Sequence, residues 1–198
     1  MSGYLQQFSG YVLAGGRSRR MGRDKAFLTI GDKSFAENSI SILSSVCKNR
    51  VKFVVNADQA TFLKRFPAGS ETIFDTYKNR GPVGGIHAAL RDCKIKFAIV
   101  IAVDLPFIQP TLIEELAQQA FKTNNSVVAV SEDGRIPLCC TFKKGNKIDA
   151  ALAKFSRDKN TSFLRFLSFI EPEKFQIASN AELFNVNYPE DFERIQAL

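Results

Sequence analysis

Short apolar runs that alternate with helical patterns constrain the fold of this 198-residue chain more than any other feature. The runs are rich in Val, Ile and Phe and are flanked by polar or glycine-containing turns, which is typical of buried strands. They lie at residues 11–13, 51–55, 72–74, 97–103 and 127–130. Each run is too short to be anything but a strand or a fragment of a buried helix, so the helical patterns between them decide the fold class.

Two of those helical patterns carry clear start signals. Ser34 to Glu37 reads Ser-Phe-Ala-Glu, a capping box that predicts a helix to about Val46. Thr111 to Glu114 has the same form and predicts a helix to about Lys122. Strands that alternate with helices predict an α/β fold with a mostly parallel central sheet and helices on both faces.

The later part of the chain alternates less clearly. We expect a strand over 138–142 and helices near 147–155 and 162–169, in a region that flanks a site rather than forms the sheet centre. Residues 184–187 read as a strand. Pro189, Glu190 and Asp191 then predict a last helix, with proline at its first position and two acids in its first turn.

Composition predicts one ordinary globular domain without linkers or repeats. The longest apolar run, 97–103, is too short to span a bilayer, and the first residues do not resemble a secretory leader, so we expect a cytoplasmic protein. The four cysteines show no metal-site spacing and are expected to be reduced, mostly buried thiols. The net charge of +7 fits either an anionic partner or a solvated basic surface.

The loop after the first predicted strand has the features of a polyphosphate cradle. Gly15 and Gly16 are followed by five cationic side chains within nine residues, from Arg17 to Lys25. Glycines let backbone N–H groups approach a ligand, and Arg and Lys donate charge-assisted hydrogen bonds to phosphate oxygens. The spacing matches neither a P-loop nor a dinucleotide fingerprint. The alternative is a strand-to-helix turn with a basic, solvated rim.

A second glycine-rich segment, Gly81 to Gly85, is expected to be a tight loop that leads into a helix N-terminus, an environment that attracts anions. The single histidine, His87, follows in helical rhythm and receives no role. The eighteen phenylalanines are expected to form core rather than a base-stacking surface.

Asp104 appears abruptly at the end of the most apolar strand. A carboxylate there must be solvated, hydrogen-bonded or bound to a cation, which makes Asp104 the candidate ligand for Mg²⁺; the alternative is a turn-capping aspartate. Asn56 and Asp75 occupy the equivalent places after the second and third strands. Because the carboxyl ends of parallel strands meet at one edge, we expect these three side chains to converge there.

Together these residues resemble the molybdenum cofactor guanylyltransferase family. Leu13 to Lys25 matches the family pattern L-A-G-G-x-S-x-R-M-G-x-D-K at every specified position. Weaker similarities follow at Gly81 to Ile86, at Asp104 to Pro106, and at Asn185 to Asp191, where the family has N-x-N-T-P-E-D. Two positions depart from the pattern, Val103 in place of a frequent Cys and the bulkier Tyr188 in place of Thr.

The resemblance implies a three-layer Rossmann-like nucleotidyltransferase fold over a single domain, 1–198, with a nucleotide-binding half at 8–105 and an acceptor-side half at 106–198. It implies transfer of GMP from GTP to molybdopterin, with release of pyrophosphate and with Mg²⁺ as cofactor. Transient contacts with other molybdenum cofactor biosynthesis proteins or acceptor molybdoenzymes are compatible with that role; no nucleic-acid or membrane partner is expected.

The resemblance also assigns roles to individual residues. Asp104 would hold Mg²⁺, Lys25 and Arg20 would stabilise the phosphates of the leaving pyrophosphate, and Asn187 would hold a metal-bound water. The predicted nucleotide-binding set is Leu13, Ala14, Gly15, Gly16, Lys25, Asn56, Asp75, Gly81, Gly84 and Asp104, with Asn56 and Asp75 on the guanosine. Two rivals remain open: a nucleotidyltransferase of the same fold that uses CTP or a sugar phosphate, and a non-catalytic nucleotide- or RNA-binding module.

Overall fold

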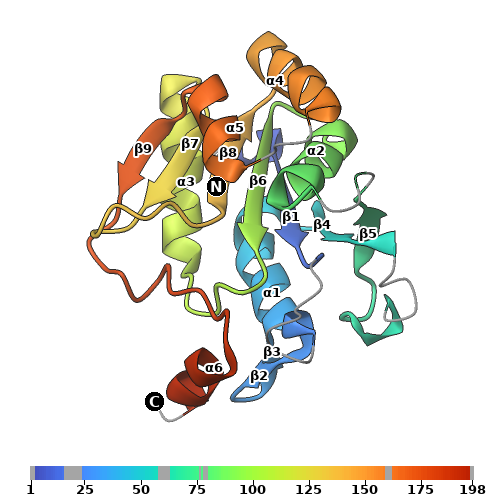
Figure 1. Cartoon of the computed structure of the whole chain (residues 1–198), viewed down its shortest axis with the longest axis vertical. Coiled ribbons are helices and arrows are strands. Elements are labelled where there is room, and N and C mark those ends of the chain that lie inside the picture. Colours follow the sequence, from blue (N-terminus) through green and yellow to red (C-terminus); the bar gives the residue numbers. More distant parts are fainter. Residues whose placement is uncertain are drawn as a thin grey trace.

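A seven-stranded sheet forms the centre of the computed structural model, which describes residues 3–15, 24–57, 63–75, 77, 80–158 and 162–196 (Figure 1). In spatial order its strands are β5 (Glu71–Phe74), β4 (Val51–Val55), β1 (Phe8–Leu13), β6 (Phe97–Ala102), β8 (Cys139–Lys143), β7 (Val127–Val130) and β9 (Glu173–Gln176). Strand β8 runs antiparallel to both of its neighbours, and the other four strand pairs are parallel.

The strands next to β1 end level with it. Leu13, the last residue of β1, pairs with Val54 of β4 on one side and with Ala102 of β6 on the other. The carboxyl ends of three parallel strands therefore lie at one edge of the sheet, where side chains from the following loops meet.

Helices cover both faces of the sheet (Figure 1). One face packs against α1 (Phe35–Cys47) and α3 (Pro110–Thr123), and the other packs against α2 (Pro82–Asp92), α4 (Asn146–Arg157) and α5 (Phe163–Ile170). Within β1, Phe8 and Val12 belong to the first core, whereas Tyr11 and Leu13 belong to the second. This alternation of side chains confirms the predicted three-layer α/β architecture.

Smaller elements complete the described chain. They are two 3₁₀ helices, η1 (Gly3–Gln7) and η2 (Lys25–Phe27), a short hairpin of β2 (Thr29–Ile30) and β3 (Lys33–Ser34), and the last helix α6 (Pro189–Gln196). No helix in the described ranges is long and apolar enough to cross a membrane. All four cysteines are buried, and none forms a disulfide.

One of the two predicted helix starts is confirmed, and the other is wrong. Ser34 and Glu37 form the predicted capping box of α1, with the Glu37 N–H donating to Ser34 Oγ over 3.2 Å and the Ser34 N–H donating to Glu37 Oε2 over 2.7 Å. Thr111 is not a cap, because α3 begins one residue earlier at Pro110, whose fixed φ suits the first helical position. Helix α2 likewise begins at Pro82, so the predicted glycine loop ends at Gly81, whose φ is +57°.

Two expectations for the later chain are wrong, and one strand was not predicted. Residues 138–142 were expected outside the sheet centre, yet β8 lies inside the sheet between β6 and β7. Residues 184–187 form no strand, because single hydrogen bonds to Asp104 and Asp191, rather than a ladder, bind the backbone there. Strand β9 was missed because its sequence, Glu-Lys-Phe-Gln, has only one apolar residue to reveal it.

Candidate functional site

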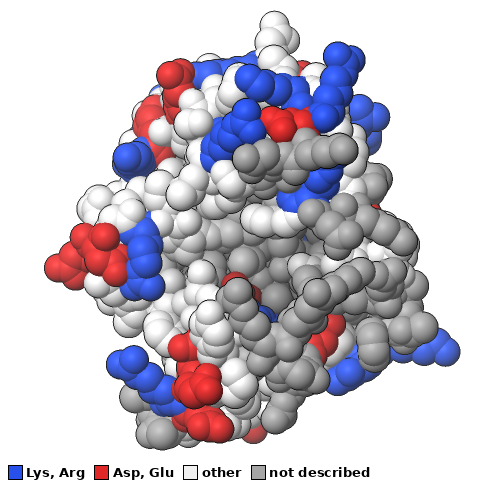
Figure 2. All heavy atoms as spheres, viewed as in Figure 1, with Lys and Arg blue, Asp and Glu red and all other residues white. Residues whose placement is uncertain are grey.

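A cavity of about 530 Å³ opens at the carboxyl ends of β1 and β6. Figure 2 shows a hollow in the middle of this face, between basic side chains at the top of the view and acidic side chains over α6 below. The described residues that line the cavity come from seven segments: Leu13 to Gly15, Asp24 and Lys25, Gly81 and Pro82, Ala102 to Asp104, Ile136 to Leu138, Phe163, and Asn185 with Asn187.

Backbone hydrogen bonds fix the floor of this cavity to the sheet. The N–H groups of Ala14 and Gly15 both donate to the Val54 carbonyl, over 2.9 and 3.0 Å. The Val103 N–H donates to the Leu13 carbonyl over 3.1 Å. The turn that carries Asp104 and the start of the loop after β1 are therefore held side by side.

Three glycines lie where the loop after β1 and the first turn of α2 pack against neighbouring residues, and we call them the glycine wall: Gly15, which lines the cavity, and Gly84 and Gly85, which are not among its described lining residues. A Cβ on Gly15 would lie 3.0 Å from Asn56 Oδ1 and 3.2 Å from the Asn56 backbone nitrogen. A Cβ on Gly84 would lie 2.7 Å from Asp75 Oδ2. These contacts require glycine, because the loop after β1 and the first turn of α2 approach the ends of β4 and β5 too closely for any side chain.

The N-terminus of α2 faces the cavity beside this wall. Gly81 is the N-cap and has no side chain, so it leaves the first N–H groups of the helix without a side-chain acceptor. Gly81 and Pro82 both line the cavity. Uncapped N–H groups and the positive end of the helix dipole favour an anion at this position.

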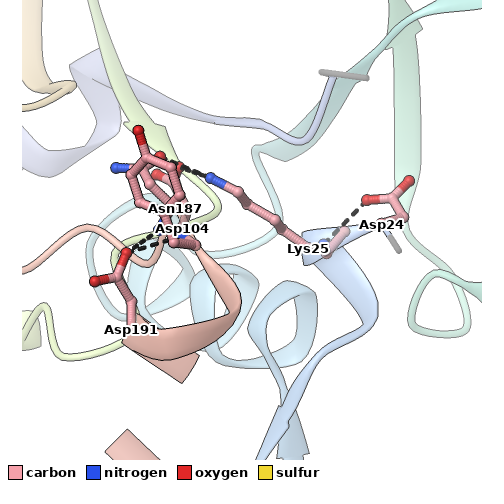
Figure 3. A network of polar contacts seen from close by, with 7 residues as sticks. Asp24, Lys25, Asp104, Asn187 and Asp191 are labelled. Carbon is pink, nitrogen blue, oxygen red and sulfur yellow. Dashed lines mark hydrogen bonds and ion pairs between the residues drawn. The ribbon is translucent and has the colours of Figure 1, made fainter. Parts of the chain in front are cut away.

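The opposite wall is polar and holds a three-residue cluster (Figure 3). The Lys25 ammonium donates to Asp104 Oδ2 over 2.9 Å and to Asn187 Oδ1 over 2.7 Å. The Lys25 and Asp104 side chains are only 14% and 19% exposed. Two oxygens from segments far apart in sequence therefore converge on one cationic nitrogen inside a half-enclosed site, which we call the polar cluster.

Local structure places each member of the polar cluster. Lys25 begins η2, which Asp24 caps by accepting the Ala26 N–H over 3.1 Å. Asn187 is held next to Asp104 because the preceding Val186 N–H donates to the Asp104 carbonyl over 3.0 Å. The predicted proximity of Lys25, Asp104 and Asn187 is thus present, although Asn187 does not lie on a strand.

Asn56 and Asp75 lie behind the glycine wall, outside the described lining of the cavity. Asp75 follows β5, its N–H donates to the Val55 carbonyl over 2.8 Å, and its Oδ1 accepts the Tyr77 N–H over 2.8 Å. Burial raises the pKa of the Asp75 carboxyl, and the Tyr77 hydrogen bond opposes that rise. Asp104 lines the cavity, but Asn56 lies against Gly15 and Asp75 lies against Gly84, so the three side chains do not converge as expected.

Some predicted residues are not placed, and some site residues were not predicted. Gly16 and every cation of the loop except Lys25, Arg20 included, lie outside the described residues. The apolar side of the cavity, made by Phe163 and by residues 136–138, carries no sequence signal, because it combines a loop and a helix start that are distant in the chain. His87 lies in α2, where its ring meets the Tyr77 ring edge-on at 4.7 Å.

The donor set of the polar cluster fits a hard divalent cation. Asp104 and Asn187 present a carboxylate and an amide oxygen to the same point. Asn185 Oδ1 is buried without a hydrogen-bond partner in the described structure, and Asn185 lines the same cavity. The described residues contain no group of three or more His, Cys, Asp or Glu side chains that could form an all-protein cage. One carboxylate with neutral oxygens suits Mg²⁺ that also binds phosphate and water.

Comparisons with known proteins agree with this geometry. The family model of the MobA-like NTP transferase domain matches residues 10–171, which include every cavity segment except the one with Asn185 and Asn187. A relative from Opitutus terrae, named a probable molybdenum cofactor guanylyltransferase, is 30% identical over 203 residues, which cover 98% of this chain and 97% of that protein.

Solved structures show how widely the fold is shared. Molybdopterin-guanine dinucleotide biosynthesis protein A from Archaeoglobus fulgidus superimposes with a TM-score of 0.74 at 24% identity, over 96% of this chain and 97% of that one. The 4-diphosphocytidyl-2C-methyl-D-erythritolsynthase from Anaerococcus prevotii superimposes with a TM-score of 0.73 at 14% identity, over 100% and 98% of the two chains. Proteins named for different nucleotides thus share this architecture.

Proposed function

Because the chain belongs to the MobA-like NTP transferase family and is a nucleotidyltransferase, we propose that it transfers GMP from GTP to molybdopterin and releases pyrophosphate. The observation that carries the proposal is the polar cluster of Lys25, Asp104 and Asn187, which lines one cavity together with Gly15 and the N-terminus of α2. Such a cavity offers an anion both cationic and backbone donors.

On the nucleotide side, we assign the backbone of Leu13, Ala14 and Gly15 to contact with GTP. All three residues line the cavity, and backbone hydrogen bonds to Val54 and Val103 hold them in place. Gly16, Gly81 and Gly84 complete this surface in the proposal. Asn56 and Asp75, held against the glycine wall, would bind the guanosine portion.

In the proposed reaction, an oxygen of the molybdopterin phosphate attacks the α-phosphorus of GTP in line. A new phosphorus–oxygen bond forms, the bond to the β-phosphate bridging oxygen breaks, and pyrophosphate leaves with the electron pair. The phosphate monoester is already anionic, so no side-chain nucleophile or base is required. The task of the protein is to position two anions and to neutralise the charge that develops on the leaving group.

Lys25 performs the neutralising role in this proposal, together with Arg20. Its ammonium is largely shielded from solvent, where an electrostatic contact is stronger than in water. Mg²⁺ held by Asp104 and Asn187 would supply a Lewis acid that binds phosphate oxygens. The four-carbon stem of Lys25 lets its ammonium turn from these two oxygens to the phosphates.

The acceptor side is assigned to the apolar part of the same cavity. Phe163 and residues 136–138 offer a flat hydrophobic surface suited to a pterin ring, and they belong to the proposed acceptor-side half, residues 106–198. The nucleotide-binding half, residues 8–105, supplies the glycine wall and Lys25. Asn185 and Asn187 return from the second half to the polar cluster.

The two rival functions have less support. A cytidylyl transferase would share the fold, but that likeness is at 14% identity, whereas the Opitutus terrae relative, at 30% identity over 98% of this chain, bears a guanylyltransferase name. A non-catalytic RNA-binding module would leave Asp104 and Asn187 without a purpose, because carboxylate and amide oxygens do not attract a phosphate backbone.

The deciding experiment incubates the protein with Mg²⁺ and each of the four nucleoside triphosphates, with and without molybdopterin, and measures pyrophosphate. We expect release only with GTP and the pterin together. Release with CTP in place of GTP would overturn the base assignment, and release without the pterin would overturn the acceptor.

A further inference from the structure

The backbone N–H of Asn187 is held by a carboxylate four residues further along the chain. Asp191, in the first turn of α6, accepts two hydrogen bonds with a single oxygen, Oδ2. The donors are the Asn187 N–H at 2.8 Å and the Tyr188 N–H at 2.9 Å. Figure 3 shows Asp191 below Asn187, on the side away from Lys25.

One of these two bonds is an ordinary helix cap and the other is not. Tyr188 directly precedes Pro189, so its N–H is the donor that an acid at the third helical position usually accepts. Asn187 lies one residue further out, where α6 gains nothing from a fixed N–H. The second bond instead fixes the residue whose side chain enters the polar cluster.

A chain of contacts therefore leads from α6 to the cavity. Asp191 orients the Asn187 backbone, and Asn187 Oδ1 accepts from Lys25 Nζ over 2.7 Å. Residues 184–187 are not part of a sheet. The Val186 N–H bond to the Asp104 carbonyl holds the segment beside the Asp104 turn, and Asp191 holds the next residue, Asn187. We propose that Asp191 is a positioning residue for the transfer reaction, acting through Asn187 on the polar cluster; the inference rests on the proposed function of that cluster.

The neighbouring acid provides a matched control. Glu190 lies in the same first turn of α6, carries the same charge and is exposed. Removing either carboxylate changes the net charge and the helix-dipole interaction by the same amount. Only the removal of Asp191 also frees the Asn187 N–H.

The test is a double-mutant cycle on the full chain. Asp191→Ala, Asn187→Ala, the double variant and Glu190→Ala are compared in kcat and KM for GTP with molybdopterin and Mg²⁺. Residues that orient a ligand-binding side chain are typically worth about 10-fold to 100-fold in activity, so we expect Asp191→Ala and Asn187→Ala each to lose that much kcat/KM. Because Asp191 acts through Asn187, the double variant should be within about 2-fold of Asn187→Ala alone.

A purely structural role would give a different result. Loss of a helix cap lowers the melting temperature, yet its effect on activity would add to that of Asn187→Ala. Additive losses, or an equal loss in Glu190→Ala, would overturn the proposal. Asp191→Asn retains an acceptor oxygen and should recover part of the activity; it replaces Asp191→Ala in the cycle if the alanine variant does not fold.

The inference and the proposed function fail in distinguishable ways. If the wild type releases pyrophosphate with a nucleotide other than GTP, the proposed function fails, and the cycle is measured with that nucleotide. If the wild type shows no turnover, the same variants are compared by calorimetric affinity for GTP with Mg²⁺. In each case coupling between Asp191 and Asn187 supports the positioning role, and its absence overturns it.

Discussion

The glycine wall reaches the cavity only through Gly15, whereas all three residues of the polar cluster line it, and different forces define the two regions. On the glycine wall, Gly15 and Gly84 are fixed by what they lack, since a Cβ on either would collide with Asn56 or Asp75. In the polar cluster, Lys25 and Asp104 are fixed by hydrogen bonds between charged groups. The glycine wall is part of the packing between the sheet and α2. The polar cluster consists of side chains that belong to neither hydrophobic core.

This difference predicts how each wall responds to substitution. A change on the glycine wall must move backbone, so it affects stability and binding together. A change in the polar cluster removes charge from a site that the core does not need, so it affects chemistry alone. Substitutions in the two regions therefore test whether effects on stability and effects on chemistry can be separated.

Removal of the Asp104 carboxylate should have the largest effect on turnover. Asp104→Ala takes away the proposed metal anchor, and we expect kcat to fall by about 10³-fold, since such electrostatic contacts stabilise the transition state. The fold should persist, because Asp104 lies beyond the end of β6, beside the cavity, and belongs to neither core. Pyrophosphate release and thermal unfolding are the measurements, with the exposed Glu115→Ala as control. Near-normal guanylyl transfer by Asp104→Ala would contradict the assignment.

Loss of the Lys25 ammonium should come next. Lys25→Ala is expected to lower kcat/KM for GTP by about 10²-fold, because one positioned donor to the developing charge is lost. The exposed Lys122→Ala, and Arg17→Ala at a position that the family pattern leaves free, should change kcat/KM far less. Equal losses in all three variants would mean that the lysine acts only as diffuse positive charge.

A glycine-to-alanine pair tests the steric wall. Gly84→Ala would bring Cβ within 2.7 Å of Asp75 Oδ2, whereas Gly85→Ala would meet Leu13 Cδ1 at 3.0 Å. At 3.0 Å the buried Leu13 side chain must give by only a few tenths of an ångström, whereas the contact with Asp75 is shorter and Asp75 is held by Tyr77. We expect Gly84→Ala to destabilise the fold by about 1 to 3 kcal/mol and to raise KM for GTP. Gly85→Ala should leave stability and KM nearly unchanged. A larger loss of stability in Gly85→Ala than in Gly84→Ala would contradict the steric explanation.

The two walls also differ in how far sequence predicts them. Lys25 and Asp104 could be predicted because a charged residue after a glycine loop or an apolar strand is conspicuous by itself. The need for glycine at position 84 could not, because it depends on Asp75, which is nine residues away and on another element. A single chain shows residue types but not which distant atoms they meet.

Contacts between distant residues also explain the errors in the predicted fold. The alternation of strands and helices predicted both layers of helices and the parallel strands β1, β4 and β6. The place of β8 was missed because antiparallel insertion next to β6 is decided by pairing between distant residues, such as Val100 with Cys140. Residues 184–187 have the alternation of a strand, but Asp191 and Asp104 provide acceptors that replace a neighbouring strand.

The smallest expected effect is the loss of stability caused by the buried, charged Asp75 carboxylate behind the glycine wall. Burial raises the pKa of its carboxyl in the folded state, so the folded protein holds this proton more tightly than the unfolded chain. Stability from this group is therefore complete below the ordinary aspartate range and is lost as pH rises through the raised pKa. Asp75→Asn does not titrate and retains an oxygen for the Tyr77 N–H.

Asp75→Asn should therefore melt at a higher temperature than the wild type at pH 7, and this advantage should shrink as pH falls toward the ordinary aspartate range. The exposed turn residue Asp32 provides the control, since Asp32→Asn should show no such pH-dependent gain. The same Asp75→Asn protein should bind GTP more weakly, because the carboxylate is proposed to contact the guanosine. A stability gain coupled to weaker GTP binding would show that Asp75 serves binding at the expense of stability, although its side chain packs against Gly84 of the glycine wall. A gain that is equal at all pH values would instead show that the buried charge carries no cost.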